Sequence, residues 1–444
     1  MPISKILPNF ANTEIHTPIV TNPTPQSPAK RLAIIGGGAA GFFLAINVKR
    51  MVPGLDVTIF EKRSKVLAKV AVSGGGRCNC TNTFRDITDL KQAYPRGAQL
   101  LKRLFRHFGP QDTFRWFEEH GVPLVVQDDQ CVFPQAQDSR AIIDCFLREA
   151  RRLGVKILLN TPIDDPASLP HDFIAVTIGG TPKAAGCVPS LFTFNIDDPR
   201  LHTLMGTVVD NATASIPGTK LRAQGALLIT HWGMSGPAIL RLSSYAARHL
   251  AETGYRSPLL INWTGETNAD TVREQLTTLL HHNPHKQLSN LRPFNLPTRL
   301  WEYLTEKATA PTKRCADISQ HSPNRHADIS QQSLNRHTDI SQQTPKRCAD
   351  ISKKELNRLT ELLTADPYTI ASRCHYKDEF VTCGGVPLDT IDKSTLASLA
   401  TPHIYYAGEV LDIDGVTGGF NLQAAWTTAH TVAQAIAAQC HPTS

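Results

Sequence analysis

A glycine-rich turn between two regular segments constrains the fold of this chain more than any other feature. Residues 31–35, RLAII, are short and apolar and predict a buried strand, and residues 42–51 have the composition of a helix. Between them, Gly36, Gly38 and Gly41 occupy the glycine places of G-x-G-x-x-G. The first glycine allows a tight turn, the second lets a pyrophosphate approach the backbone, and the third lets the helix pack on the strand. The pattern predicts a dinucleotide-binding turn at the start of an α/β domain.

An acidic residue stands where such a turn requires one. Residues 56–60, DVTIF, predict the second strand, and Glu61 follows it, 20 residues after Gly41. Its carboxylate can accept hydrogen bonds from both hydroxyls of a ribose, and the positive end of the intervening helix faces the phosphates. The alternatives are a glycine-rich turn in another kind of α/β protein and a membrane span. Residues 32–48 carry no charge, but they are slightly short for a span.

A second run of glycines lies shortly after this unit. Gly74, Gly75 and Gly76 stand inside the segment SGGGRCNCTN, and Arg77 follows them directly. Glycines lack side chains, so backbone N–H groups can approach phosphate or ring atoms here, and the guanidinium can offset phosphate charge. Taken alone, the run fits a mobile glycine loop equally well. Next to the first turn, it favours a cofactor-binding loop.

Length and composition limit the broad class of the protein. The 444 residues exceed one ordinary core and predict two or three domains. The net charge of +7 arises from 46 basic and 39 acidic residues spread along the chain, which does not favour a nucleic-acid partner. The ten cysteines include no C-x-x-C pair, so we expect reduced thiols, a cytoplasmic protein and no metal site. Residues 1–30 lack an apolar signal region and are expected to be a disordered tail.

Copies of an 11-residue unit interrupt the second half of the chain. They begin at Cys315, His326, His337 and Cys348, and the first reads CADISQHSPNR. A period of 11 residues can produce a supercoiled helix, but each copy offers little apolar surface to bury besides its isoleucine. We therefore expect residues 315–358 to form a polar surface loop, and we do not expect its histidines to bind a metal ion.

The remaining segments alternate between strand-like and helix-like patterns. The helical spacing over residues 100–120 is broken by Gly109 and Pro110, which predicts two helices, with Asp112 as a cap for the second. Further expectations are strands at 122–126, 131–134, 155–160 and 173–180, a helix at 139–153, a strand, a turn at 233–237 and a helix within 225–250, helices in 264–309, and a strand, turn and helix within 403–438. This order predicts an α/β fold with parallel strands.

Six motifs in order along the chain carry a resemblance to a known family. They are IIGGGAAG, SGGGRCNCTN, PSLFTFNI, THWGMSGPAIL, CGGVPLDTID and YYAGEVLDIDGVTGGFNLQAAW. Together they resemble the BaiN-like family of FAD-dependent oxidoreductases, which also takes in aminoacetone oxidase-like flavoproteins. The resemblance implies a discontinuous Rossmann-type FAD-binding domain at 31–188 and 370–444. It also implies an inserted β-rich domain at 189–263 and an inserted helical domain at 264–369 that contains the repeats.

The resemblance also implies which residues would bind FAD. The first glycine turn would hold the pyrophosphate, the second run would pass along the flavin half, and the helix after Gly419 would direct its positive end at the flavin ring. The implied cofactor contacts are Gly36, Gly38, Ala39, Ala40, Gly41, Glu61, Lys62, Lys69, Ser73, Gly74, Gly75, Gly76, Arg77, Cys78, Asn79, Gly408, Glu409, Gly418, Gly419, Phe420, Asn421 and Leu422. The chain departs from the family pattern at 161–172 and 184–188, where it is shorter.

These features predict an FAD-dependent oxidoreductase that acts on a small molecule by hydride transfer through flavin N5. No second G-x-G-x-x-G occurs in the sequence, so NAD(P)H would dock transiently as the reductant, or oxygen would be the acceptor. His231 in THWGMSG is a candidate acid–base residue because histidine exchanges protons near neutral pH, although a histidine in a strand-end turn more often has a structural role. The alternatives are a degenerate flavin-binding protein without turnover and a flavoprotein that modifies tRNA. No nucleic-acid or membrane partner is expected.

Overall fold

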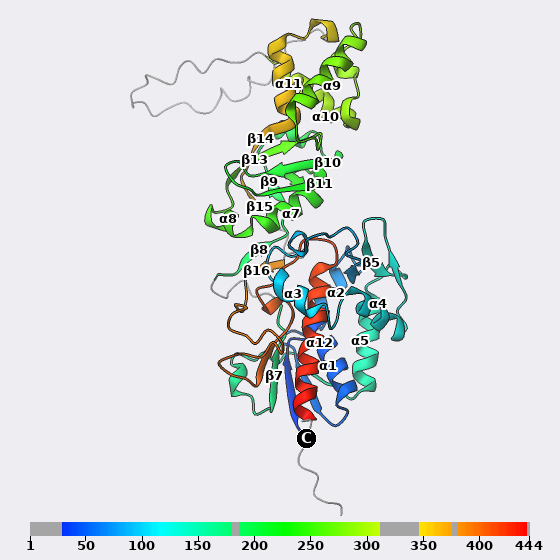
Figure 1. Cartoon of the computed structure of the whole chain (residues 1–444), viewed down its shortest axis with the longest axis vertical. Coiled ribbons are helices and arrows are strands. Elements are labelled where there is room, and N and C mark those ends of the chain that lie inside the picture. Colours follow the sequence, from blue (N-terminus) through cyan, green and yellow to red (C-terminus); the bar gives the residue numbers. More distant parts are fainter. Residues whose placement is uncertain (1–28, 180–185, 311–345, 375–380, 442–444) are drawn as a thin grey trace, which may run out of the picture.

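The computed structural model describes residues 29–179, 186–310, 346–374 and 381–441. The expected N-terminal tail and most of the first three repeat copies lie outside these ranges. Figure 1 shows the described chain as two parts along the long axis. One part contains both the first strand and the last helix, and the other contains a second sheet with a group of helices at its far end.

A parallel five-stranded sheet forms the centre of the first part. Its strand order is β17-β7-β1-β2-β6, and every neighbouring pair is parallel. The strands are β1 Arg31–Ile35, β2 Asp56–Phe60, β6 Lys156–Leu158, β7 Phe173–Val176 and β17 Ile404–Tyr406. A strand from the C-terminal end of the chain thus completes the sheet that β1 begins. The predicted α/β fold with parallel strands is confirmed.

Two long helices pack together against this sheet. Helices α1 (Ala39–Met51) and α12 (Phe420–Cys440) lie side by side in Figure 1. Phe43 of α1 contacts Trp426 of α12 with the ring centroids 5.2 Å apart, and both side chains are fully buried. The uncharged stretch at 32–48 is therefore a buried strand and helix. No helix within the described ranges is long and apolar enough to cross a membrane.

The short segment 161–172 lies against the parallel sheet. It contains a turn of 3-10 helix, Pro166–Ser168, whose Ala167 N–H donates to the Asp165 carboxylate at 3.0 Å. Ile163 and Leu169 of this segment pack on a small cluster of buried sheet residues: Ala33, Ile35, Ile174, Val176 and Ile404. The segment is shorter than the family resemblance implies, yet it still covers this cluster.

A three-stranded antiparallel sheet and four helices stand beside the parallel sheet. The sheet order is β3-β5-β4, with β3 Thr81–Asn82, β4 Leu124–Val126 and β5 Cys131–Pro134. The helices are α2 Ala68–Val72, α3 Ala98–Leu104, α4 Pro110–Glu119 and α5 Arg140–Arg152. The predicted cap of α4 is corrected. Gly109 is the N-cap because Pro110 takes the first helical position, and the Asp112 carboxylate accepts from the Gly109 N–H at 2.8 Å.

A seven-stranded antiparallel sheet forms the centre of the second part. Its order is β14-β13-β10-β11-β12-β9-β15. The strands are β9 Phe194–Asn195, β10 Val208–Ser215, β11 Arg222–Ile229, β12 Gly233–Ser235, β13 Ser257–Asn262, β14 Asp366–Ile370 and β15 Ser372–Arg373. Two expectations are corrected here. Residues 233–235 form a strand rather than part of a turn because they pair with β11 and β9. The boundary placed at residue 370 falls inside this sheet because β14 and β15 belong to it.

Helices accompany this sheet and share its core. The helices are α6 Pro199–His202, α7 Pro237–Tyr245, α8 Ala247–Glu252, α9 Ala269–His282, α10 Thr298–Thr309 and α11 Lys353–Ala365. In Figure 1, α9, α10 and α11 form the far end of the molecule, and α7 and α8 lie on the side toward the first part. Trp263 beside the sheet and Trp301 of α10 belong to one buried cluster, so the sheet and the far helices are packed as one unit.

The fourth repeat copy corrects the expectation of a polar loop. Cys348–Asp350 form a 3-10 helix, and α11 begins within the same copy. This copy reads SKKELNR where the second copy reads SQQSLNR, so Ser352 caps the helix and Glu355 completes a capping box. The leucines that follow, including Leu359 and Leu363, supply the apolar face that the repeat itself lacks. The other copies, at 315–345, lie outside the described residues.

Glu355→Gln is expected to lower the free energy of unfolding by about 1 kcal/mol at pH 7. Burial alone would raise the pKa of Glu355, but hydrogen bonds from Lys346 and Ser352 lower it to about 2. Because this pKa lies below that of a glutamate in an unfolded chain, the stabilisation is complete above roughly pH 4.3 and is lost as the pH falls toward 2. Urea denaturation at several pH values measures this, with Glu361→Gln on the exposed side of α11 as the control. A deficit independent of pH would contradict the assignment.

A two-stranded antiparallel sheet connects the two parts. It pairs β8 (Val188–Ser190) with β16 (Val381–Cys383), one from each crossing of the chain between the parts. Figure 1 shows both strands between the seven-stranded sheet and the parallel sheet. The second part is therefore an insertion joined to the first through paired strands.

Candidate functional site

The first glycine turn has distinct steric requirements at its three glycines. Gly36 has φ +115°, and a Cβ there would lie 2.8 Å from the Thr177 carbonyl oxygen. A Cβ at Gly41 would lie 2.1 Å from the Gly36 carbonyl oxygen. At Gly38, in contrast, a Cβ would meet no atom within 4 Å. Helix α1 begins at Ala39 with no side-chain cap, so its first N–H groups lie beside open space and can receive an anion.

Glu61 lies at the end of β2 against this turn. One carboxylate oxygen accepts from the Gly37 N–H at 2.9 Å, and the other accepts from the Arg63 N–H at 2.9 Å. Each carboxylate oxygen can accept more than one hydrogen bond, so a ribose can still be bound. The next residue, Lys62, is exposed. The contact between Glu61 and a ribose stays a prediction.

Glu61→Ala is expected to raise the Kd for FAD about tenfold to hundredfold, because a hydrogen bond to a charged group contributes roughly 1.5–3 kcal/mol. Reduction of the bound flavin should change little, since the ribose lies far from N5. Titration of the apo-protein with FAD measures the affinity, and Glu118→Ala, an exposed acid on α4, is the matched control. Wild-type affinity in Glu61→Ala would exclude Glu61 as the ribose ligand.

The second glycine run forms a left-handed loop directly after α2. The glycines at 74–76 have φ of +59°, +68° and +84°, a region that other residues rarely adopt. A Cβ on the first of them would lie 2.8 Å from the Asn79 backbone nitrogen, whereas a Cβ at Gly75 would meet no atom within 4 Å. The N–H of buried Cys78 donates to the Ser73 carbonyl oxygen at 2.9 Å and closes the loop. The loop is thus fixed at its base and open at Gly75.

Arg77 contacts protein groups beside this loop. Its guanidinium lies 4.2 Å from the centre of the Phe133 ring. It also donates to the Gln137 side-chain oxygen and to the Gly74 carbonyl oxygen, each at 3.3 Å. These contacts give Arg77 a role in holding the loop on β5. Its predicted contact with phosphate stays a prediction.

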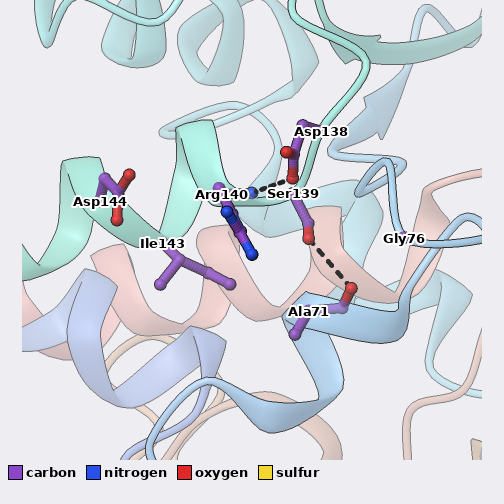
Figure 2. Close-up of a pocket in the computed structure, with 7 residues that line it drawn as sticks. All are labelled: Ala71, Gly76, Asp138, Ser139, Arg140, Ile143 and Asp144. Atoms are coloured by element: carbon purple, nitrogen blue, oxygen red, sulfur yellow. Dashed lines mark hydrogen bonds between the residues drawn. The ribbon is translucent and has the colours of Figure 1, made fainter.

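Figure 2 shows an open recess between α2 and the start of α5, on the border of this loop. The recess has a volume of about 960 Å³ and is lined by Ala71, Gly76, Asp138, Ser139, Arg140, Ile143 and Asp144. The Ser139 hydroxyl donates to the Ala71 carbonyl oxygen at 3.0 Å, and the Ser139 N–H donates to the Gly76 carbonyl oxygen at 2.9 Å. These two hydrogen bonds attach the second glycine loop to α5.

The loop before α12 meets the second glycine loop. The Asn79 side chain accepts from the Gly419 N–H at 3.1 Å and donates to the Thr81 carbonyl oxygen at 2.9 Å. The Asn82 amide donates to the Gly418 carbonyl oxygen at 3.1 Å. Gly419 has φ +84°, and a Cβ there would lie 2.2 Å from the Thr81 carbonyl oxygen. Helix α12 then begins with no side-chain cap, so its positive end lies at this junction.

The first residues of α12 shape the loop that precedes it. The Asn421 side chain accepts from the Gly415 N–H at 2.8 Å and donates to the Gly415 carbonyl oxygen at 2.9 Å. Phe420 is buried, and its carbonyl oxygen accepts from the Tyr94 hydroxyl at 2.8 Å. Leu422 is half-buried. These side chains hold the loop in place, and contacts of theirs with a cofactor stay a prediction.

A third contact joins the C-terminal loop to α1 and α2. Gly408 has φ +79°, and a Cβ there would lie 2.8 Å from the Ala40 Cβ. The adjacent Glu409 forms an ion pair with Lys69 at 2.6 Å and accepts from the Thr382 N–H at 3.0 Å. The structure therefore brings Ala40, Lys69, Gly408 and Glu409 together from three distant segments.

The two glycine loops and the loop at 408–419 converge on one region. Gly38 and Gly75 expose backbone that an extended ligand can approach without a clash. Neither α1 nor α12 has a side-chain N-cap. Two such helix ends suit two separated polar groups, such as the pyrophosphate and the pyrimidine edge of FAD. The residues present therefore fit FAD.

His231 does not join this region through any contact within the described ranges. It lies exposed between β11 and β12, with its ring centroid 4.3 Å from that of Trp232. This placement is that of a strand-end turn in the second part of the molecule. An acid–base role of His231 stays a prediction.

Sequence reasoning missed a buried ion pair behind the C-terminal loop. Arg96 pairs with Asp414, whose side chain is 0% exposed. Asp414 also accepts from the Ser190 hydroxyl at 3.2 Å, and Arg96 donates to the Ser244 carbonyl oxygen of α7 at 2.9 Å. The pair thus ties the C-terminal loop to both β8 and α7. The only sequence signal was an aspartate among apolar and glycine residues, with no sign of a partner 318 positions away.

Comparison with known families places the chain. The HI0933-like protein Rossmann domain matches residues 30–188, and the HI0933-like protein barrel and H2TH domain matches residues 188–332. The two matches together span more than half of the sequence. The chain belongs to the HI0933-like family. The Rossmann match contains both glycine loops, so the predicted resemblance and the Rossmann-type fold are confirmed.

Relatives of this HI0933-like chain match it almost from end to end. The 3-dehydro-bile acid delta(4,6)-reductase of Clostridium scindens is 24% identical over 92% of this chain and 99% of the relative. The ribosomal RNA dihydrouridine synthase of Haemophilus influenzae is 25% identical over 91% and 98%. A solved 3-ketosteroid delta1-dehydrogenase from Sterolibacterium denitrificans is 12% identical, with a TM-score of 0.43 over 93% of this chain and 100% of that one. The predicted class, an oxidoreductase of an FAD-dependent family, is confirmed at the level of the family.

Proposed function

We propose that this protein uses FAD to reduce a carbon–carbon double bond conjugated to a carbonyl group in a small molecule. The observation that carries the proposal is the convergence of two glycine loops and the 408–419 loop at two uncapped helix ends. The names of the relatives support the substrate class. Reduction of a 3-oxo bile acid at its delta(4,6) bonds and formation of dihydrouridine from uridine both saturate a double bond conjugated to a carbonyl.

The residues of the chain bind and orient the cofactor in this proposal. The N–H groups at the start of α1 would hold the pyrophosphate, and Glu61 would bind the adenosine ribose. The start of α12 would face the flavin ring and stabilise negative charge there. The hydrogen bond between Asn79 and Gly419 holds the second glycine loop next to that helix end. Bound FAD supplies hydride transfer through N5.

The reductant in the proposal is NAD(P)H, which would dock transiently. The sequence contains no second G-x-G-x-x-G, so no separate nicotinamide domain is implied. A transient site is compatible with open approach to the flavin before the substrate binds. The substrate would then occupy the same side after the nicotinamide has left.

The test begins with the absorption spectrum of the purified protein. We expect the bands of oxidised flavin, and acid should release FAD rather than FMN. Anaerobic NADH or NADPH should bleach these bands, and androst-4-ene-3,17-dione or uridine monophosphate, added next, should restore them. A colourless protein that cannot be reconstituted with FAD would contradict the proposal. A yellow protein that neither nucleotide reduces would favour the alternative of a flavin-binding protein without turnover.

A further inference from the structure

One face of helix α7 lies along the seam between the two parts of the molecule. The opposite face is buried in the second part through Ile239 and Leu242. On the seam face, the Tyr245 hydroxyl donates to the Gln92 carbonyl oxygen at 3.0 Å. Beyond the end of the helix, Arg248 pairs with Asp412 at 3.1 Å. Gln92 and Asp412 both belong to the first part, so α7 carries the side chains that meet it.

Arg241 lies one turn before Tyr245 on this same face, because residues four apart in a helix are neighbours. Its surroundings differ from those of the other seam arginines. Arg96 and Arg248 each pair with an aspartate, whereas no carboxylate in the described part of the chain forms an ion pair with Arg241. Its one hydrogen bond runs from NH1 to the Gln224 carbonyl oxygen at 3.3 Å.

The Nε atom of Arg241 is buried and has no hydrogen-bond partner within the described ranges. A buried guanidinium N–H without an acceptor is costly, by about 1–3 kcal/mol or more for a charged group. Evolution retains such a cost where the group has a ligand to bind. The missing partner is an acceptor, and a negatively charged oxygen would satisfy it best.

Arg241 also lies near the second glycine loop. Burial raises the pKa of the Cys131 thiol to about 11, while a hydrogen bond with Asn79 and the charge of Arg241 act in the opposite direction. Cys131 pairs with Asn82 across β3 and β5, directly after the glycine run. Arg241 therefore approaches from the second part toward the segment that the proposed function places along the flavin.

We propose that Arg241 is a substrate-binding residue that holds the carbonyl oxygen of the substrate at this seam; the inference rests on the proposed function. When a hydride adds to the β carbon of a conjugated carbonyl compound, the electron pair of the double bond moves toward oxygen. The oxygen gains the negative charge of an enolate, and the α carbon takes a proton from water. Arg241 donates a hydrogen bond to that oxygen and keeps its own proton, so it stabilises the charge that develops.

The test uses 4-chlorophenol, whose phenolate resembles an enolate and gives a long-wavelength absorption band when it stacks on oxidised flavin. The FAD-loaded protein is titrated with this probe, and with 4-chloroanisole, which has no ionisable oxygen. We expect Arg241→Gln to weaken phenolate binding about tenfold to hundredfold and to leave 4-chloroanisole binding unchanged. Arg241→Lys should recover part of the affinity, and Arg222→Gln, at the exposed start of β11, should match the wild type.

Stability and FAD content distinguish this role from the others. Because an unpaired buried group is removed, Arg241→Met should have a melting temperature equal to or above that of the wild type. A marked drop in both Arg241→Met and Arg241→Gln would make Arg241 structural and overturn the proposal. Loss of FAD affinity in Arg241→Gln, or phenolate binding equal to that of the wild type, would also overturn it. A wild-type protein that is yellow but binds no phenolate refutes the role of Arg241 alone, whereas a protein that binds no FAD refutes the proposed function.

Discussion

Asp414→Ala is expected to lower the free energy of unfolding by about 3–5 kcal/mol, because it leaves the Arg96 guanidinium without its buried partner. The Asp414 side chain is 0% exposed and that of Arg96 is 15% exposed, so water cannot replace the lost carboxylate fully. The Ser190 hydroxyl loses an acceptor as well. Urea denaturation followed by tryptophan fluorescence measures this change.

A double variant separates the value of the pair from the cost of breaking it. Burial raises the pKa of Asp414 more than Arg96 lowers it, which indicates that desolvation opposes the attraction within the pair. Arg96→Met with Asp414→Leu should therefore be less destabilised than Asp414→Ala alone. If the double variant is the less stable protein, the pair contributes net stability and this account is wrong. Asp412→Ala, which breaks the more exposed pair with Arg248, should cost about 1 kcal/mol or less.

The pair also has a position that matters for the site. Asp414 stands in the loop that carries Gly408 and Gly419, and Arg96 binds the Ser244 carbonyl oxygen of α7. Loosening this pair should therefore displace the start of α12 and the seam together. We expect the double variant to bind FAD more weakly than the wild type even where it folds well, because a hydrophobic pair cannot reproduce the hydrogen bond to α7.

The parts of the fold that depend on neighbouring residues could be predicted from the sequence. The first strand, the glycine turn, α1 and Glu61 form one local unit, in which spacing alone specifies each role. Helix α11 was missed because its start depends on Glu355 within one repeat copy and on leucines outside the repeat. The boundary at residue 370 was misplaced because β14 takes its partner from β13, about a hundred residues earlier. No local pattern records such a pairing.

The candidate site shows the same division. The glycine positions followed from the sequence because each one is required by a turn or by a close approach of backbone. The contact between Asn79 and Gly419 could not be predicted, since it depends on how α12 docks across the molecule. The side-chain direction of Arg77 could not be predicted either, because it follows from the ring of Phe133 on a strand that pairs with the loop only in the folded protein. Arg241 carried no signal at all before its helix was placed at the seam.

Gly419→Ala is expected to lower the free energy of unfolding by about 2–5 kcal/mol and to raise the Kd for FAD at least tenfold. The residue has φ +84°, which costs alanine about 1 kcal/mol or more. Its Cβ would also lie 2.2 Å from the Thr81 carbonyl oxygen and 2.6 Å from the Asn79 side-chain oxygen, so the backbone must move at a cost of about 1–3 kcal/mol. That movement separates the start of α12 from the second glycine loop.

Gly154→Ala provides the matched control for Gly419→Ala. Gly154 has a similar φ of +71°, but a Cβ there would meet no atom within 4 Å, and it lies between α5 and β6, outside the three loops. It should therefore show the backbone strain alone, about 1 kcal/mol, with unchanged FAD affinity. Thermal unfolding and FAD titration of both variants measure the two effects. Equal losses of stability in the two variants would mean that contact with Thr81 is easily relieved, and equal FAD affinities would mean that the junction at Gly419 does not position the cofactor.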